Sequence, residues 1–229
     1  MRKTISVLIL LAGLTSASEG PEGWIVPFAA AYQPDVAGFN AKFASAGLPE
    51  ARTRHFGWGI EVRSLTGGLL VGPLFFRTWD DVENDLFQVR TDATGILGEV
   101  GLKVPLGSML TVVPMIGLGG LSQSFSIRKQ TGRLSLDSLL GSPGQTAGLS
   151  PGMKLAGLAA LELDFAVRTV SGRYGVALRG GYLYSPMGLS WKLNNGAEVT
   201  NVPVTHLGGP FFSVGILILP EPQVTGVSP

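Results

Sequence analysis

TGILGEVGLKVPLGSMLTVVPMIGLGGLSQSFSIR, the stretch from Thr94 to Arg128, decides the fold. Its first arm places Ile96 and Val100 on one face, and Glu99 and Lys103 on the other. Because successive side chains of a strand point to opposite faces, this period of two predicts a β-strand. A short turn of Pro, Leu, Gly and Ser leads into a second arm with a similar alternation. The stretch therefore predicts a long β-hairpin with one apolar face and one face of charge and glycine.

The composition indicates that the apolar face is turned toward lipid. Charged residues make up 14% of the 229-residue chain, against roughly 25% in soluble domains. The mean hydropathy is +0.33, yet no run beyond the N-terminus reaches the ~20 apolar residues of a membrane helix. High hydropathy without such a run is typical of a membrane β-barrel, in which alternation dilutes the apolar signal.

The N-terminus predicts export. Arg2 and Lys3 precede a short apolar core, Ile5–Leu14, and the small residues Thr15-Ser16-Ala17 offer a cleavage site. These are the three parts of a secretory signal peptide. We therefore assign residues 1–17 to a signal peptide, 18–219 to the barrel and 220–229 to a C-terminal extension, and predict a bacterial outer-membrane location after cleavage.

The rest of the chain predicts an all-β, up-and-down antiparallel transmembrane barrel of about eight strands. A short helix, Val36–Ala46, follows the first strand, and Asp35 is placed to cap it. Connections after strands two, four and six are short, and those after strands one, three, five and seven are longer, as in outer-membrane barrels. In the fourth and fifth strands the apolar residues change face, which predicts a bulge in each. The predicted strands are Trp24–Gln33, His55–Ser64, Leu69–Trp79, Leu86–Val104, Met109–Arg128, Met153–Val167, Arg173–Met187 and Pro210–Leu219.

If the apolar faces look at lipid, the opposite faces line the lumen. An eight-stranded barrel has an interior that side chains just fill, so we predict a polar network in place of a wide pore. Its predicted members are Glu61, Arg63, Glu99, Lys103, Glu162, Asp164, Arg173 and Arg179. The aromatic residues predicted to face the membrane are Trp24, Tyr32, Trp58, Tyr174, Tyr182 and Tyr184.

Few sequence features point to a catalytic, metal-binding or ligand-binding site. With no Cys, disulfides and thiolate metal sites are excluded. The net charge of +1 and the lack of a basic cluster give no case for nucleic acid. No GxSxG, HExxH or Walker pattern occurs, so we predict no cofactor, no metal and no catalytic residue, and favour a non-enzymatic protein. Two weaker alternatives are a site on the barrel rim built from His55 or His206 with Ser190 or Ser213, and calcium bound by Asp80, Asp81, Glu83 and Asp85.

The segment that ends the first strand with Tyr-Gln-Pro-Asp and continues as DVAGFNAKFASAGLP, residues 35–49, is followed by long glycine-rich strands. With the signal peptide, this arrangement resembles poorly characterised bacterial outer-membrane β-barrel proteins over roughly residues 24–219. The resemblance implies a membrane barrel and names no activity. One feature departs from it: such barrels often end in an aromatic residue, whereas here Leu219-Pro220 is followed by nine more residues.

Several functions remain open from the sequence. The leading hypothesis is a structural or interaction protein of the outer membrane, in contact with membrane lipid and with an extracellular ligand bound through the long loops. The second is a small-solute or lipid-related transporter with residues 36–46 as a plug. A lipid-active enzyme of the rim and a soluble periplasmic β-barrel are the others. The oligomeric state is not predicted.

Overall fold

The computed structural model describes residues 22–129, 146–169, 172–193, 195–200, 202–203 and 207–219. The predicted signal peptide, the C-terminal extension and His206 lie outside these ranges.

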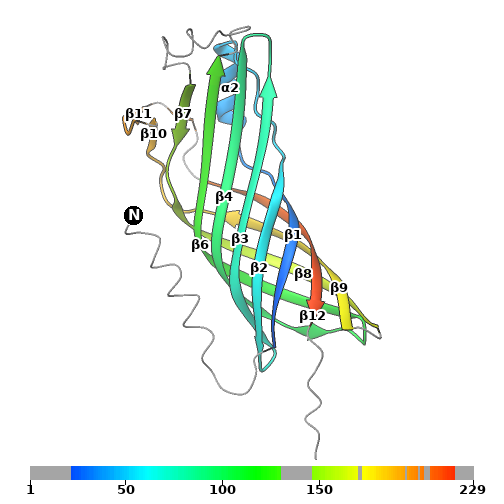
Figure 1. Cartoon of the computed structure of the whole chain (residues 1–229). Helices are drawn as coiled ribbons and strands as arrows, with labels where there is room; N and C mark the ends of the chain where they lie inside the picture. The colour runs from blue at the N-terminus through cyan, green and yellow to red at the C-terminus, as the bar shows by residue number, and fades with distance from the viewer. Residues whose placement is uncertain are drawn as a thin grey trace, which may run out of the picture.

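Eight long strands close into an antiparallel barrel, which confirms the predicted fold (Figure 1). Each of these strands pairs with the barrel strand that precedes it and with the one that follows it along the chain, and the ring closes where the first strand pairs with the last. The strands are β1 (Glu22–Tyr32), β2 (His55–Thr66), β3 (Leu69–Glu83), β4 (Phe87–Leu102), β6 (Leu110–Lys129), β8 (Lys154–Thr169), β9 (Gly172–Tyr184) and β12 (Gly208–Leu219).

The side chains of the ring are arranged as the membrane interpretation requires. Val176, Leu178 and Tyr182 point outward with exposed fractions of 42%, 40% and 53%, whereas Arg179 between them is 4% exposed. The same alternation continues around the ring, for example along the outward residues Phe212, Val214, Ile216 and Ile218 of β12. We call this outward apolar surface the belt. A soluble barrel would bury these side chains, because apolar surface is driven out of water.

Four strands are much longer than a bilayer requires. A membrane strand needs roughly 9–11 residues, whereas β3, β4, β6 and β8 have 15, 16, 20 and 16. The far halves of β3, β4 and β6 rise beyond the other strands at the end where the long connections lie (Figure 1). We call this end the loop end, the other the turn end, and the risen part of the sheet with the elements on it the extension.

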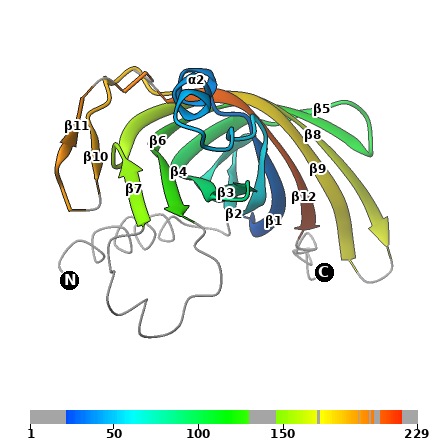
Figure 2. The same ribbon diagram turned by 90° about the horizontal axis from the view of Figure 1, so that it is seen from above.

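Short elements complete the extension. They are α2 (Ala37–Ser45), β7 (Thr146–Ser150), β10 (Trp191–Leu193) and β11 (Glu198–Val199); β5 (Val104–Pro105) lies at the turn end. β7 pairs with the risen part of β6, and β10 and β11 continue the sheet to one side of the barrel (Figure 2). β7 runs on into β8 through Pro151-Gly152-Met153, where the pairing with β6 shifts by one residue. Gly152 has φ +71°, a left-handed conformation that glycine adopts readily in such a bulge.

The predicted bulges in the fourth and fifth strands are wrong. β4 pairs with β3 and with β6 in one unbroken register along its whole length. What changes is the environment. Within the belt Ile96 and Val100 face outward, whereas in the extension the inward Val89 and Phe125 are 0% and 1% exposed. The apolar residues change face because the extension has water outside it and packed side chains inside it.

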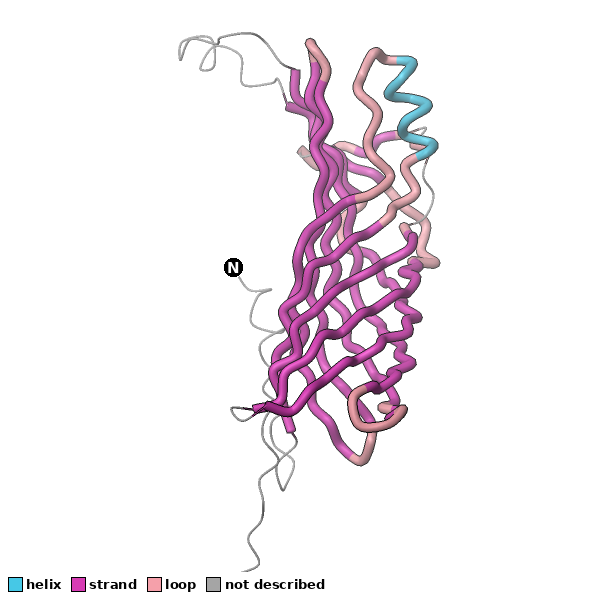
Figure 3. The backbone as a smooth tube through the Cα atoms, turned by 90° about the vertical axis from the view of Figure 1, so that its right-hand side faces the viewer, coloured by secondary structure: helices cyan, strands magenta, loops and turns pink. Residues whose placement is uncertain are grey.

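Helix α2 covers the inner face of the extension (Figure 3). It begins and ends one residue inside the predicted range, and Phe39 and Phe43 are its buried residues. Among the described residues, no helix is long and apolar enough to span a bilayer.

The longer connection predicted after the third strand, residues 80–85, is a continuation of that strand followed by a tight turn. β3 continues to Glu83, and three residues then lead into β4. The Asn84 side-chain oxygen accepts hydrogen bonds from the backbone N–H groups of Leu86 (3.0 Å) and Phe87 (2.8 Å). This side-chain cap closes the turn and lets the hairpin extend above the belt.

Candidate functional site

Six charged side chains meet inside the barrel near the turn end. Glu61 and Arg63 come from β2, Glu99 from β4, Glu162 and Asp164 from β8, and Arg179 from β9, and all are buried. Each occupies an inward position of its strand, so the period of two places them together. Four carboxylates and two guanidinium groups give this charged cluster a formal charge of −2.

Arg179 is the centre of the charged cluster. Its Nε donates to Glu162 at 3.0 Å, its Nη1 lies 3.1 Å from Glu99, and its Nη2 donates to Glu61. Arg63 adds ion pairs with Glu61 (2.9 Å), Glu162 (2.6 Å) and Asp164 (3.6 Å). These contacts link β2, β4, β8 and β9 across the lumen, and they repay part of the penalty for burying the charges.

Two predicted members lie outside the charged cluster. Lys103 follows β4 at the turn end, and its backbone N–H donates to the carbonyl of Gly68 at 2.9 Å. Arg173 lies at the start of β9, also at the turn end, and both side chains are partly exposed. Neither makes an ion pair with a described side chain, because the turn end gives them access to solvent.

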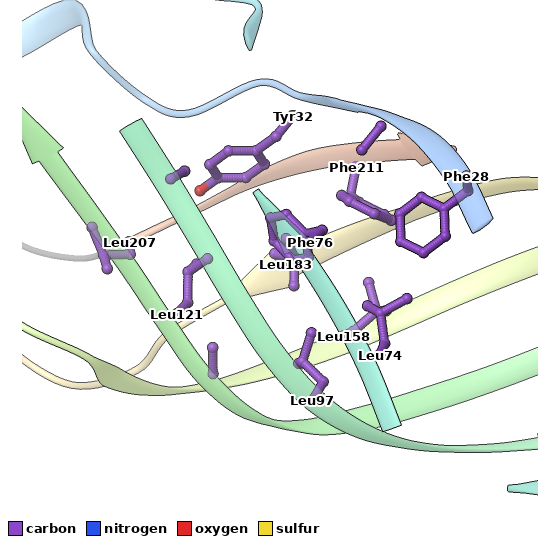
Figure 4. Close-up of a cluster of buried hydrophobic side chains, with 13 residues drawn as sticks. Phe28, Tyr32, Leu74, Phe76, Leu97, Leu121, Leu158, Leu183, Leu207 and Phe211 are labelled. Atoms are coloured by element: carbon purple, nitrogen blue, oxygen red, sulfur yellow. The ribbon is translucent and has the colours of Figure 1, made fainter. Parts of the chain in front are cut away.

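An apolar layer fills the middle of the barrel, which the prediction of a polar lumen missed (Figure 4). Phe211 contacts two other rings of the layer, with its ring centroid 4.8 Å from that of Phe76 and 6.4 Å from that of Phe28 in an edge-on contact. A second apolar group, which includes Trp24, Val113 and Leu217, packs beside the charged cluster. The lumen is thus packed by apolar side chains as well as by ion pairs. The labelled members of the middle layer are Phe28, Tyr32, Leu74, Phe76, Leu97, Leu121, Leu158, Leu183, Leu207 and Phe211.

Glycines make room for the large rings of this layer. A methyl group at Gly59 would lie 2.1 Å from the ring of Phe28, and one at Gly95 would lie 2.1 Å from the ring of Phe76. Both glycines are the cross-strand neighbours of the phenylalanines that cover them. The pairing of an inward glycine with an inward aromatic residue is the sequence signal that could have revealed the layer.

Four aromatic rings close the space under α2. Phe39 lies 4.2 Å from Phe125 and 5.0 Å from Trp191 between ring centroids, and Phe43 lies 5.9 Å from Phe125. The helical spacing of Phe39 and Phe43 was visible in the sequence, but their partners on β6 and β10 were not. This aromatic cap lies above the belt and ties the helix to the extension.

Two of the six aromatic residues predicted to face the membrane point inward. Trp58, Tyr174, Tyr182 and Tyr184 are 40–53% exposed on the outer surface, but Trp24 and Tyr32 are 6% and 1% exposed. The correction has a simple cause. Both faces of β1 are apolar, and its outward positions are Ile25, Pro27, Ala29 and Ala31.

Within the described residues, neither a rim site built on His55 nor the calcium site has the geometry that it requires; the rim site built on His206 lies outside these residues. His55 is fully buried, and neither ring nitrogen has a hydrogen-bond partner among the described residues. Ser213 is buried on β12, Ser190 is exposed, and no hydrogen bond described joins either to His55. In the described ranges, no group of three or more His, Asp or Glu side chains is placed to hold a metal ion.

Two acidic residues of the extension, Asp80 and Asp92, are paired with arginines. Arg52 lies 3.3 Å from Asp80, Arg90 lies 2.9 Å from Asp92, and Arg77 lies 3.0 Å from Asp92. Burial alone would raise the pKa of Asp92, but the hydrogen bonds from Arg90 and Arg77 outweigh it and hold that pKa below its usual value. The pairs of Arg90 and Arg77 with Asp92 lie on the outer face just above the belt, whereas Asp80, whose side chain is 12% exposed, lies on the inward side of β3.

Comparison with known proteins supports the fold. No protein-family model and no curated protein matches the chain. Among solved structures, the chain is similar to a major outer membrane protein from Thermus thermophilus, at 11% identity and a TM-score of 0.52 over 85% of this chain and 99% of that one. It is also similar to the attachment invasion locus protein Ail of Yersinia pestis (12% identity, TM-score 0.48, 86% and 99% covered). Neisserial surface protein A is a third (13% identity, TM-score 0.44, 87% and 99% covered). At these identities the likeness concerns the fold, and the Thermus match supports a barrel of the outer-membrane type.

Proposed function

We propose that this protein is a bacterial outer-membrane β-barrel with a structural or interaction role, and that its extension presents the surface for partners. The observation that carries the proposal is the inverted arrangement of the ring. The closed ring of strands has apolar side chains on its outer surface, and its ion pairs are buried inside. Lipid is the environment in which that arrangement is stable.

The packed interior supports a closed barrel rather than a transporter. The charged cluster and the apolar layer are built from residues of the strands and of Leu207 beside β12, so they fill the lumen without the helix. Helix α2 packs against the extension, above the belt, through Phe39 and Phe43. A plug formed by residues 36–46 is therefore not needed to keep the barrel shut.

The connections support an orientation. Tight turns such as Gly67-Gly68 lie at the turn end, and α2, the β3–β4 turn and the β10–β11 hairpin lie at the loop end. In outer-membrane barrels the short turns face the periplasm and the longer loops face outward. The extension, after signal-peptide cleavage and insertion, then faces the cell exterior and is the surface for an extracellular ligand.

The experiment combines fractionation with conductance. We expect the full chain to stay in the membrane pellet after alkaline carbonate washing, and to migrate differently on SDS gels before and after boiling. In planar bilayers we expect no porin-sized steps from the protein or from a variant lacking residues 37–45. Release into the soluble fraction would refute the membrane assignment, whereas steps in the deletion variant alone would establish the plugged transporter.

A further inference from the structure

A shallow cup lies on the outer surface where β2 begins, beside β3. It encloses about 440 Å³ and is lined by Phe56, Gly57, Trp58, Trp79, Asp80 and Asp81. Phe56, Trp58 and Trp79 are 64%, 51% and 38% exposed. Three large, exposed aromatic side chains therefore surround the cup.

The cup sits at the border between the belt and the extension. Below it, the Trp58 ring lies 5.7 Å from that of Phe75, which belongs to the belt. Beside and above it, the outward residues of β3 are Arg77 and Asp81. A group held in the cup would therefore lie at the level of lipid headgroups, where amphipathic Trp side chains gather.

The polar groups around the cup include both signs of charge. Asp81 lies 3.9 Å from Arg90, which is committed to Asp92 at 2.9 Å, so the Asp81 carboxylate keeps acceptor capacity. The Arg77 side chain is 49% exposed and shares Asp92 through one nitrogen at 3.0 Å. A carboxylate accepts hydrogen bonds from hydroxyl groups, and a guanidinium binds phosphate.

We propose that this cup binds the phosphorylated sugar headgroup of a membrane glycolipid. The aromatic rings cover the apolar face of a sugar ring, Asp81 accepts hydrogen bonds from its hydroxyl groups, and Arg77 pairs with a phosphate. Continuity with the belt favours a glycolipid over a free saccharide, because the acyl chains then lie along the apolar surface below. The inference rests on the proposed membrane function and adds a ligand class to it.

The test is native mass spectrometry of the folded full chain released from detergent micelles. The probes are diphosphorylated lipid A, digalactosyldiacylglycerol, phosphatidylglycerol and phosphatidylethanolamine. We expect lipid A to be retained best. Phe56→Ala and Trp79→Ala should each weaken its retention by roughly 2–10-fold, the range expected for one aromatic contact. Phe212→Ala is the matched control, because Phe212 is a belt residue on β12 that is 54% exposed, and it should leave retention unchanged.

The polar contacts are tested separately. Arg77→Gln should weaken lipid A and leave the phosphate-free galactolipid unaffected, and Asp81→Asn should weaken both. Equal retention of phosphatidylglycerol, a preference for phosphatidylethanolamine, or equal losses from Phe56→Ala and Phe212→Ala would overturn the proposal, as would full displacement of lipid A by free glucosamine phosphate. Insertion of the same proteins into phosphatidylcholine vesicles is the arm for the proposed function: if insertion succeeds while selective retention fails, only the cup is wrong.

Discussion

Replacement of Arg179 by Met tests whether the charged cluster holds the barrel together. Arg179 contacts Glu61, Glu99 and Glu162, and it is the only described ion-pair partner of Glu99. Met keeps much of the volume but leaves three acidic groups with less compensation in a buried site. Removing one partner of a buried ion pair costs about 3–5 kcal/mol. We therefore expect Arg179→Met to lower the free energy of unfolding by that amount.

The assay is urea unfolding of the protein refolded into vesicles, followed by tryptophan fluorescence and by gel mobility without boiling. Adding Glu99→Gln to Arg179→Met should recover part of the loss, since residues in one network couple by about 0.5–3 kcal/mol. Arg77→Met is the control, because that side chain is 49% exposed and its pair with Asp92 should contribute less than about 1 kcal/mol. If Arg179→Met unfolds within about 1 kcal/mol of the parent protein, the charged cluster does not stabilise the barrel.

Three further changes test the belt, the apolar layer and the aromatic cap. Leu178→Arg places a charge on the lipid face and should cost about 2–4 kcal/mol in vesicle unfolding, whereas Ser124→Arg, outside the belt, should not; equal effects would contradict the membrane assignment. Gly59→Ala should lower the refolding yield, because the added methyl would lie 2.1 Å from an aromatic ring, while at the outward Gly98 it would lie 3.9 Å from the nearest atom; equal yields for the two variants would argue against tight packing. Phe39→Ala removes a buried ring that is 3% exposed and should destabilise the aromatic cap by about 3–5 kcal/mol. The expected result is faster proteolysis near residue 48, with the mobility of the barrel on gels unchanged. Unchanged proteolysis would show that the aromatic cap does not hold the helix.

The strands themselves were predictable because a period of two is a local property of the sequence. Along β9, Val176 and Leu178 alternate with Ala177 and Arg179, and one charged residue is enough to decide which face is inward. β1 offers no such marker. Trp24, Val26 and Phe28 alternate with Ile25 and Pro27, so periodicity defines two faces without saying which is the interior. That choice is fixed only by neighbours on β2 and β12, which are distant in sequence.

The middle of the lumen was missed for a related reason. The charged residues were grouped because a buried charge needs a partner, and that rule brought together six of the eight predicted members. No similar rule identified Phe76 or Phe211 as inward residues, because an apolar side chain is stable both in lipid and in a packed interior. The glycine opposite Phe76 carried the missing information for that ring. A cavity left by Gly95 must be filled, and the inward ring on the next strand is the group that fills it.

The change of face along β4 shows that a strand's pattern follows its surroundings rather than its register. Below Gly95 the outside is lipid, so Ile96 and Val100 face outward and Glu99 faces inward. Above it the outside is water, so Arg90 and Asp92 face outward and Val89 packs inward under the helix. An apparent slip of one residue in a membrane strand therefore has two physical causes, a bulge or the edge of the bilayer. They differ in one respect: a bulge moves the apolar residues on one strand, whereas the edge of the bilayer moves them at the same height on every neighbouring strand. Here β4 and β6 change face together, which under the proposed function places the edge of the bilayer at that point.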